Sequence, residues 1–168
     1  MPTRRIDKDG SAQALREHLV YLLGGGGAHV SVEAALKGLP GDLRGRVPKG
    51  LPYSPWQLVD HLRIAQWDIM DFSRDRSHVS PQWPGGYWPE TSAPANEAAW
   101  RRSVSAFRRD LAAVKAIVLD PATDLFARIP WGDGQTILRE ALLVADHNAY
   151  HVGQFVTVRR LLGAWHEA

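Results

Sequence analysis

The sequence contains no cysteine. This absence excludes disulfide bonds, thiolate metal sites and cysteine nucleophiles, and it suits a reducing compartment such as the cytoplasm. No apolar run approaches the roughly 20 residues of a transmembrane helix. The N-terminal sequence MPTRRIDKDG also lacks the apolar segment of a signal peptide. We therefore expect a cytoplasmic protein that does not bind membranes.

The charges nearly cancel, with 20 Lys and Arg residues against 18 Asp and Glu residues and a net charge of +2. The two signs are interspersed and form no basic stripe, so nucleic-acid binding is not expected. A chain of 168 residues is long enough for one hydrophobic core. We expect a single domain over residues 1–168, in which residues 1–10 form a flexible tail.

Strand patterns are nearly absent, whereas four long segments carry apolar residues at the helical period. Pro- and Gly-rich connections separate these segments, and a short helical piece is expected at about 31–38. Ser11 and Ser54 are candidate N-caps, and Pro55 follows Ser54 at the first helical position. The glycine tract 24–27 is expected to end the first helix, and Gly163 the last. The sequence therefore predicts an all-α four-helix bundle with helices at about 11–23, 54–72, 94–119 and 135–163.

The connection 77–93 between the second and third long helices is unusually long for a bundle. Its residues, about 17, reach roughly 56 Å when fully extended, whereas a helix of about 22 residues is only roughly 33 Å long. The connection can therefore run the length of the bundle, which would make these two helices parallel.

His147 and His151 are four residues apart, so on a helix they lie on one face. Val144 and Phe155 share this face, which directs both histidines toward the core. His61 lies among apolar residues on the second long helix. A shared metal ion would satisfy the polar nitrogens of three buried imidazoles. The alternative is that each histidine is a separate core residue bonded to a carbonyl or a carboxylate.

The segments SPWQLVDHL and DHNAYHVGQ resemble the DinB/YfiT-like superfamily of bacterial four-helix-bundle proteins. The resemblance covers about residues 11–163. It implies a DinB-like, up-down-down-up bundle with a long link between helices 2 and 3. It also implies that His61, His147 and His151 bind a divalent metal, and the Gly153-Gln154 pair after the last histidine fits the family pattern.

A three-histidine site leaves coordination positions open, as in catalytic zinc sites. Zinc, nickel and iron all suit imidazole ligands, so the metal identity stays open. Some members of the superfamily use low-molecular-weight thiols, which makes a thiol-dependent transferase one interpretation and a hydrolase the other. The substrate would be a small molecule in both cases. A non-catalytic metal- or ligand-binding stress-response protein is the alternative function, and a homodimer is compatible with the long apolar helix faces.

Glu140 lies on the histidine face two turns before His147, about 10 Å away along the helix axis. It is a candidate catalytic base or substrate contact, against the alternative of a solvated residue near the helix start. Asn148 and Gln154 could bond a ligand imidazole or another bundle residue. Three tryptophans could line a pocket mouth or pack in the core: Trp56, Trp67 and Trp131.

Overall fold

The computed structural model describes residues 8–25 and 27–165, and these residues form helices without any named strand. The all-α prediction is therefore confirmed. The long helices are α1 (Lys8–Gly24), α3 (Pro55–Arg74), α4 (Glu97–Leu119) and α5 (Ile137–Leu161). Between them lie the short helix α2 (Val32–Leu36) and two 3-10 turns, η1 (Gly41–Leu43) and η2 (Gly85–Tyr87). Within the described part of the chain, no helix has both the length and the apolar character needed to cross a bilayer.

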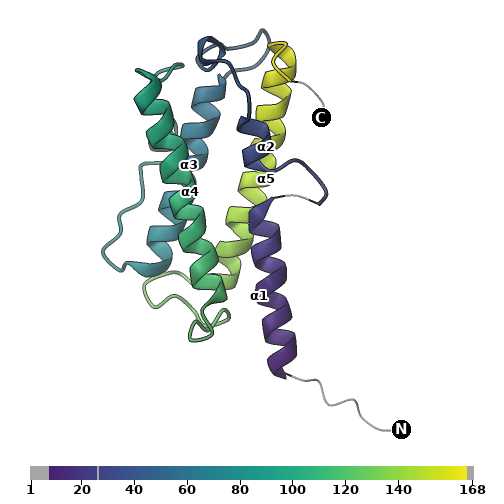
Figure 1. The fold of residues 1–168 in the computed structure, drawn as a ribbon. Coiled ribbons are helices and arrows are strands. Elements are labelled where there is room, and N and C mark those ends of the chain that lie inside the picture. The colour runs from purple at the N-terminus through teal and green to yellow at the C-terminus, as the bar shows by residue number, and fades with distance from the viewer. Residues whose placement is uncertain (1–7, 26, 166–168) are drawn as a thin grey trace.

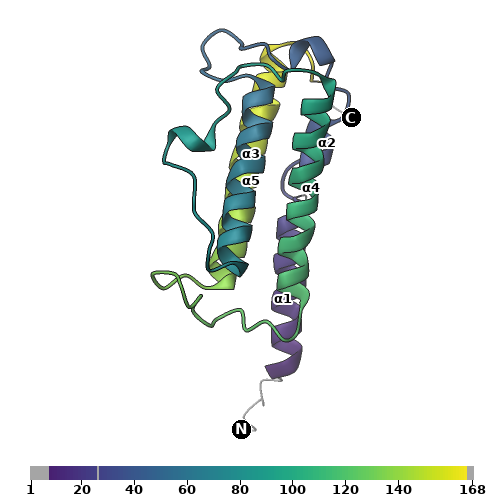
Figure 2. The same cartoon turned by 90° about the vertical axis from the view of Figure 1, so that its left-hand side faces the viewer.

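The four long helices pack side by side in a bundle (Figure 1). Helix α3 packs against α4 and α5, and α1 packs against the same two helices from the opposite corner. In Figure 1 α1 and α5 run upward along the chain, whereas α3 and α4 run downward. The connection between α3 and α4 climbs the outside of the bundle from the end of one helix to the start of the other (Figure 2). Residues of this connection lie against His61, one of the three histidines described below.

The predicted start of α3 is confirmed. Ser54 has extended backbone angles and accepts a hydrogen bond from the Gln57 backbone N–H. The Gln57 side chain in turn accepts from the Ser54 N–H, which completes a capping box, and Pro55 begins the helix. Ser54 also donates its hydroxyl to the backbone oxygen of Ser92. The start of α3 is thereby tied to the end of the long connection.

The predicted N-terminal boundary is wrong. Ser11 does not cap the first helix, because α1 already includes residues from Lys8 onward. Residues 8–10 of the expected flexible tail are therefore helical, and residues 1–7 lie outside the described part of the chain. Helix α4 begins at Glu97 rather than near 94, because the Asn96 side chain caps it by accepting from the Ala99 N–H.

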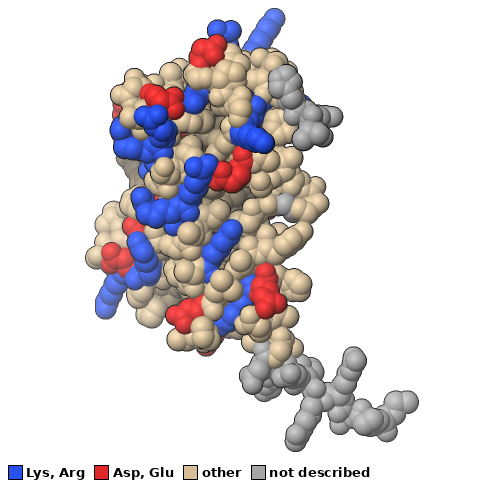
Figure 3. All heavy atoms as spheres, viewed as in Figure 1, with Lys and Arg blue, Asp and Glu red and all other residues tan. Residues whose placement is uncertain are grey.

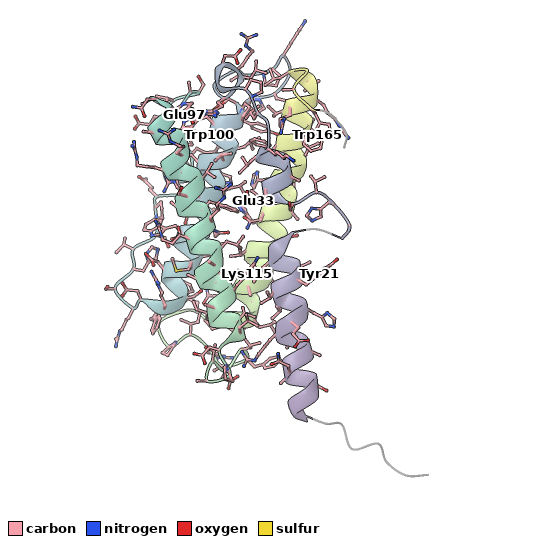
Figure 4. All side chains as sticks on the ribbon, in the orientation of Figure 1. Tyr21, Glu33, Glu97, Trp100, Lys115 and Trp165 are labelled. Carbon is pink, nitrogen blue, oxygen red and sulfur yellow. The ribbon has the colours of Figure 1, made fainter. Side chains whose placement is uncertain are left out.

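The glycine tract ends α1 as predicted, and it does so through positive backbone angles. Gly25 has φ +61° and Gly27 has φ +75°, which side chains with a Cβ rarely adopt. Helix α2 continues the same wall of the bundle beyond this break and packs on α5 (Figure 1). It leaves a groove of about 600 Å³ against α4, with Glu33 of α2 and Trp100 of α4 among its walls (Figure 4).

The core consists of two apolar clusters separated by a polar layer. Leu58 and Phe155 belong to one cluster, and Met70 and Val144 belong to the other. Between them the Gln66 amide donates to the Phe107 backbone oxygen at 2.7 Å and accepts from the Asn148 amide at 3.0 Å. Such pairing is what allows amides to remain in a core. On the face drawn in Figure 3, basic side chains are the more numerous and lie mainly over α4, with acidic side chains among them.

We predict that Ser54→Ala destabilises the protein by about 1–2 kcal/mol, because it removes the helix cap and the buried bond to Ser92. For a chain of this length that corresponds to a fall in Tm of roughly 2–8 °C. Thermal unfolding followed by circular dichroism measures it. Ser105→Ala is the control, because Ser105 is exposed within α4 and caps nothing. Equal midpoints for the two variants would contradict the prediction.

Candidate metal centre

Three histidines from two helices converge on one point. His61 comes from α3, and His147 and His151 come from successive turns of α5. The Nε2 atom of His61 lies 3.0 Å from that of His151 and 3.1 Å from that of His147. Imidazole nitrogens bound to zinc at about 2.0–2.1 Å in tetrahedral geometry are about 3.3–3.4 Å apart. The ring nitrogens are thus already close to the spacing that one shared ion requires.

The orientation of His61 is fixed from its other nitrogen. Its Nδ1 lies 2.8 Å from the backbone oxygen of Tyr87. A carbonyl oxygen can only accept, so Nδ1 carries the proton and donates it, which leaves a lone pair on Nε2. The indole of Trp88 stacks on the same imidazole, with ring centroids 3.9 Å apart and planes 1° from parallel. The hydrogen bond to Tyr87 therefore fixes the His61 ring within its plane, and the stacked indole of Trp88 fixes the orientation of that plane.

His151 is oriented in the same way from within its own helix. Its Nδ1 lies 2.7 Å from Oε1 of Gln154, three residues further along α5. The amide oxygen accepts, so the Nε2 of His151 also presents a lone pair. Two lone pairs facing each other at 3.0 Å repel unless a cation lies between them. Gln154 thus bonds a predicted ligand, and Asn148 donates to Gln66 in the core while its side chain also acts on the neighbouring His147 imidazole.

A proton does not readily relieve this repulsion, because the three histidines are difficult to protonate. Burial lowers the pKa of His147 to about 3, with further lowering by the neighbouring His151 and His61. Burial and the proximity of His61 likewise lower the pKa of His151 to about 4. The pKa of His61 is lowered by burial as well. All three imidazoles are neutral near pH 7, which is the state that binds a metal.

Aromatic rings surround the histidines. Tyr53 stacks on Trp88 at 6.2 Å, so the two rings and His61 form one continuous stack. Tyr150 meets His151 edge-on at 4.9 Å and is 63% exposed, which places it at the outer rim. Sequence reasoning missed Trp88, because the connection that carries it has no periodic pattern.

The three tryptophans considered from the sequence have other contacts. Trp56 packs against Trp100 at 6.4 Å. Trp67 meets the ring of His78 edge-on at 5.1 Å. Trp131 donates its indole N–H to the Phe72 backbone oxygen at 2.7 Å. Each is thereby explained by packing or by a backbone bond.

Glu140 is not brought into the histidine cluster. It is 4% exposed rather than solvated, and its carboxylate accepts from Arg139 at 2.6 Å. It borders a small apolar cavity that Met70 and Val144 also line. Among the described residues, the group close enough to share an ion consists of the three histidines alone. A catalytic role for Glu140 stays a prediction without a contact to the site.

Comparison with known proteins connects this site to a family. The family model of the DinB superfamily matches residues 28–155, which are 128 of the 168 residues and include all three histidines. No curated protein and no solved structure matches the chain.

We predict that the metal-free protein loses stability as the pH falls from about 7 to about 4. Histidines of the unfolded chain take up protons near the ordinary pKa of 6.5, whereas His147, with a pKa of about 3, stays neutral in the folded state. The unfolded state therefore binds more protons in this window and is favoured there. Tm measured against pH in the presence of a chelator tests this.

His147→Gln is the comparison variant, because glutamine keeps a polar side chain but does not titrate. Its Tm should depend less on pH between 7 and 4 than that of the wild type. The same pH dependence of Tm in both proteins would contradict the lowered pKa of His147.

Proposed function

Because the chain belongs to the DinB superfamily and gathers three neutral imidazoles, we propose that it is a metal-dependent enzyme acting on a small molecule. His61, His147 and His151 hold a divalent ion of zinc, nickel or iron in this proposal. The proposal includes the up-down-down-up order of the four long helices and a cytoplasmic location. The observation that supports the proposal is the 3.0 Å distance between the Nε2 atoms of His61 and His151. In both residues the Nδ1 atom carries the proton and donates it, so both Nε2 atoms present lone pairs.

The bound ion would supply Lewis acidity, which lowers the pKa of a water molecule or of a thiol. The chain's own residues hold and shield it. The Tyr87 carbonyl and the Gln154 amide keep the Nδ1 protons of His61 and His151 in place, so that both Nε2 atoms remain free. Trp88 covers one face of His61 and limits access of water to that ligand.

The ligands bear no charge, so the full charge of a divalent ion remains available to an anion. The group close enough to share the ion contains no carboxylate among the described residues. This charge balance favours a thiolate or a deprotonated water as the reacting partner. The exposed ring of Tyr150 offers an apolar face to a substrate entering beside His151. We infer a thiol-dependent transferase or a hydrolase on this basis.

A non-catalytic metal- or ligand-binding protein is the second candidate. The observation that favours it is the position of Glu140, which pairs with Arg139 away from the histidines. A hydrolase needs a group that moves a proton at the reacting atom. The enzyme interpretation therefore relies on the metal and the substrate for this step more than on a nearby carboxylate.

We predict close to one equivalent of metal in untagged protein purified without chelator. His61→Ala and His151→Ala should each lose most of it, since two histidines do not hold a divalent ion as well as three. Elemental analysis measures the content. His18→Ala is the matched control, because His18 is exposed on α1 and lies outside the cluster. No metal in the wild type, and none taken up from added zinc, nickel or iron, would overturn the proposal.

We predict that the metal-loaded protein accelerates the reaction of a small electrophile with a low-molecular-weight thiol, or the hydrolysis of a small ester or amide. Assays of bacillithiol, mycothiol and glutathione with electrophiles cover the first class. The rate should fall at least about 100-fold in His151→Ala and stay unchanged in His18→Ala. Stoichiometric metal without turnover in either class would favour the binding protein.

A further inference from the structure

The long connection is fastened to α3 by one carboxylate. Asp68 is 8% exposed, and each of its oxygens has a separate partner on the connection. His78 Nε2 lies 2.7 Å from Oδ1, and the Tyr87 hydroxyl donates to Oδ2 at 2.7 Å. The His78 side chain is itself only 5% exposed, so this is a built contact within the protein and not a chance surface pair.

One of these two residues, Tyr87, also reaches the candidate metal centre. Tyr87 directs its hydroxyl to Asp68 and its backbone oxygen to His61 Nδ1. The next residue, Trp88, stacks on the His61 ring. Asp68 and His61 are seven residues apart on α3, so they share a face of the helix and are about 10 Å apart along its axis. Tyr87 spans this gap between the carboxylate and the ligand.

We propose that Asp68 is a positioning residue for the metal centre, acting through Tyr87 to fix the tautomer and ring plane of His61. The inference rests on the proposed function, because it assigns the role of an outer partner to a residue of that same site. The side chain of Asp68 bonds His78 and Tyr87 rather than His61 itself. Asp68 would influence His61 through its hydrogen bond with the Tyr87 hydroxyl, the hydrogen bond of the Tyr87 carbonyl to His61, and the Trp88 ring stacked on His61.

Loss of the two hydrogen bonds to Asp68 would make the connection between α3 and α4 more mobile. A backbone carbonyl on an irregular segment holds a ligand only as firmly as the segment itself is held. Burial, together with the hydrogen bond to Asp68, raises the pKa of Tyr87 to about 12, so the hydroxyl remains a donor under ordinary conditions. A bond from a neutral donor to a buried carboxylate is among the stronger hydrogen bonds in proteins.

The test compares Asp68→Ala with Asp71→Ala. Both change an aspartate of α3 to a good helix former, but the Asp71 carboxylate pairs with Arg74 of its own helix and, among the described residues, makes no bond to the connection. We expect Asp68→Ala to weaken zinc binding by about 10–100-fold in competition with a chelating dye. Asp71→Ala should bind zinc as the wild type does. Tyr87→Phe removes the hydroxyl while keeping the ring and carbonyl, and should weaken binding in the same direction.

A second measurement does not depend on the metal. Nitrogen-15 correlation spectra of the metal-free protein identify which ring nitrogen of His61 carries the proton. In the wild type and in Asp71→Ala we expect Nδ1–H alone. In Asp68→Ala and Tyr87→Phe we expect a mixture of both tautomers, with faster amide exchange in residues 77–93.

The two readouts separate the failure of this inference from that of the proposed function. A wild type that binds no metal overturns the proposed function, while the tautomer shift in Asp68→Ala would still support the positioning role. Zinc binding and a His61 tautomer unchanged in both Asp68→Ala and Tyr87→Phe would overturn the positioning role and leave the metal site intact. If Asp68→Ala does not fold, the result for Tyr87→Phe decides the question.

Discussion

The hydrogen bond between His61 Nδ1 and the Tyr87 carbonyl, 2.8 Å long, is the contact on which the arrangement of the three histidines depends. It decides which nitrogen of His61 carries the proton, and so it directs a lone pair toward His151 and His147. Helix geometry alone places the two histidines of α5, because residues four apart share a face. The position of His61 is not fixed by any such spacing within one helix. His61 needs a partner from outside its own helix, and the connection between α3 and α4 provides that partner.

The bundle must hold polar groups in its interior without losing stability. It does so by pairing amides with amides or backbone, as Gln66 does with Asn148 and Phe107. His61 and His151 next to this layer follow a different rule, because their Nε2 atoms both present lone pairs and lie 3.0 Å apart. Such an arrangement costs free energy in a protein that has no cation to place there. The contrast between the two neighbouring groups is the strongest argument that the histidines serve a ligand and not the core.

The all-α fold and the three histidines that cluster could be predicted from local patterns. The capping box at Ser54 and the spacing of His147 and His151 are written into a few adjacent residues. The contacts of Asp68, Tyr87 and Trp88 could not be predicted, because they arise where an irregular segment meets distant residues of a helix. Tyr87 is 19 residues from Asp68 and 26 residues from His61 along the chain. Ser11 shows the opposite error. Serine is common at N-caps, but it also occurs within helices, and nothing local distinguished the two cases.

The choice of partners for the ligand nitrogens also determines the chemistry that the site can support. A carboxylate hydrogen-bonded directly to Nδ1 would make Nε2 of the imidazole a stronger electron-pair donor to a metal and would reduce the net charge of the site. Here His61 and His151 are bonded to a backbone carbonyl and to an amide oxygen, both of which are neutral. The buried carboxylate that fixes the connection, Asp68, is separated from His61 by the length of Tyr87. The protein thereby gains the rigidity of a charged hydrogen bond without placing the charge on the ligand, and a divalent ion bound there would retain its full pull on an anionic partner.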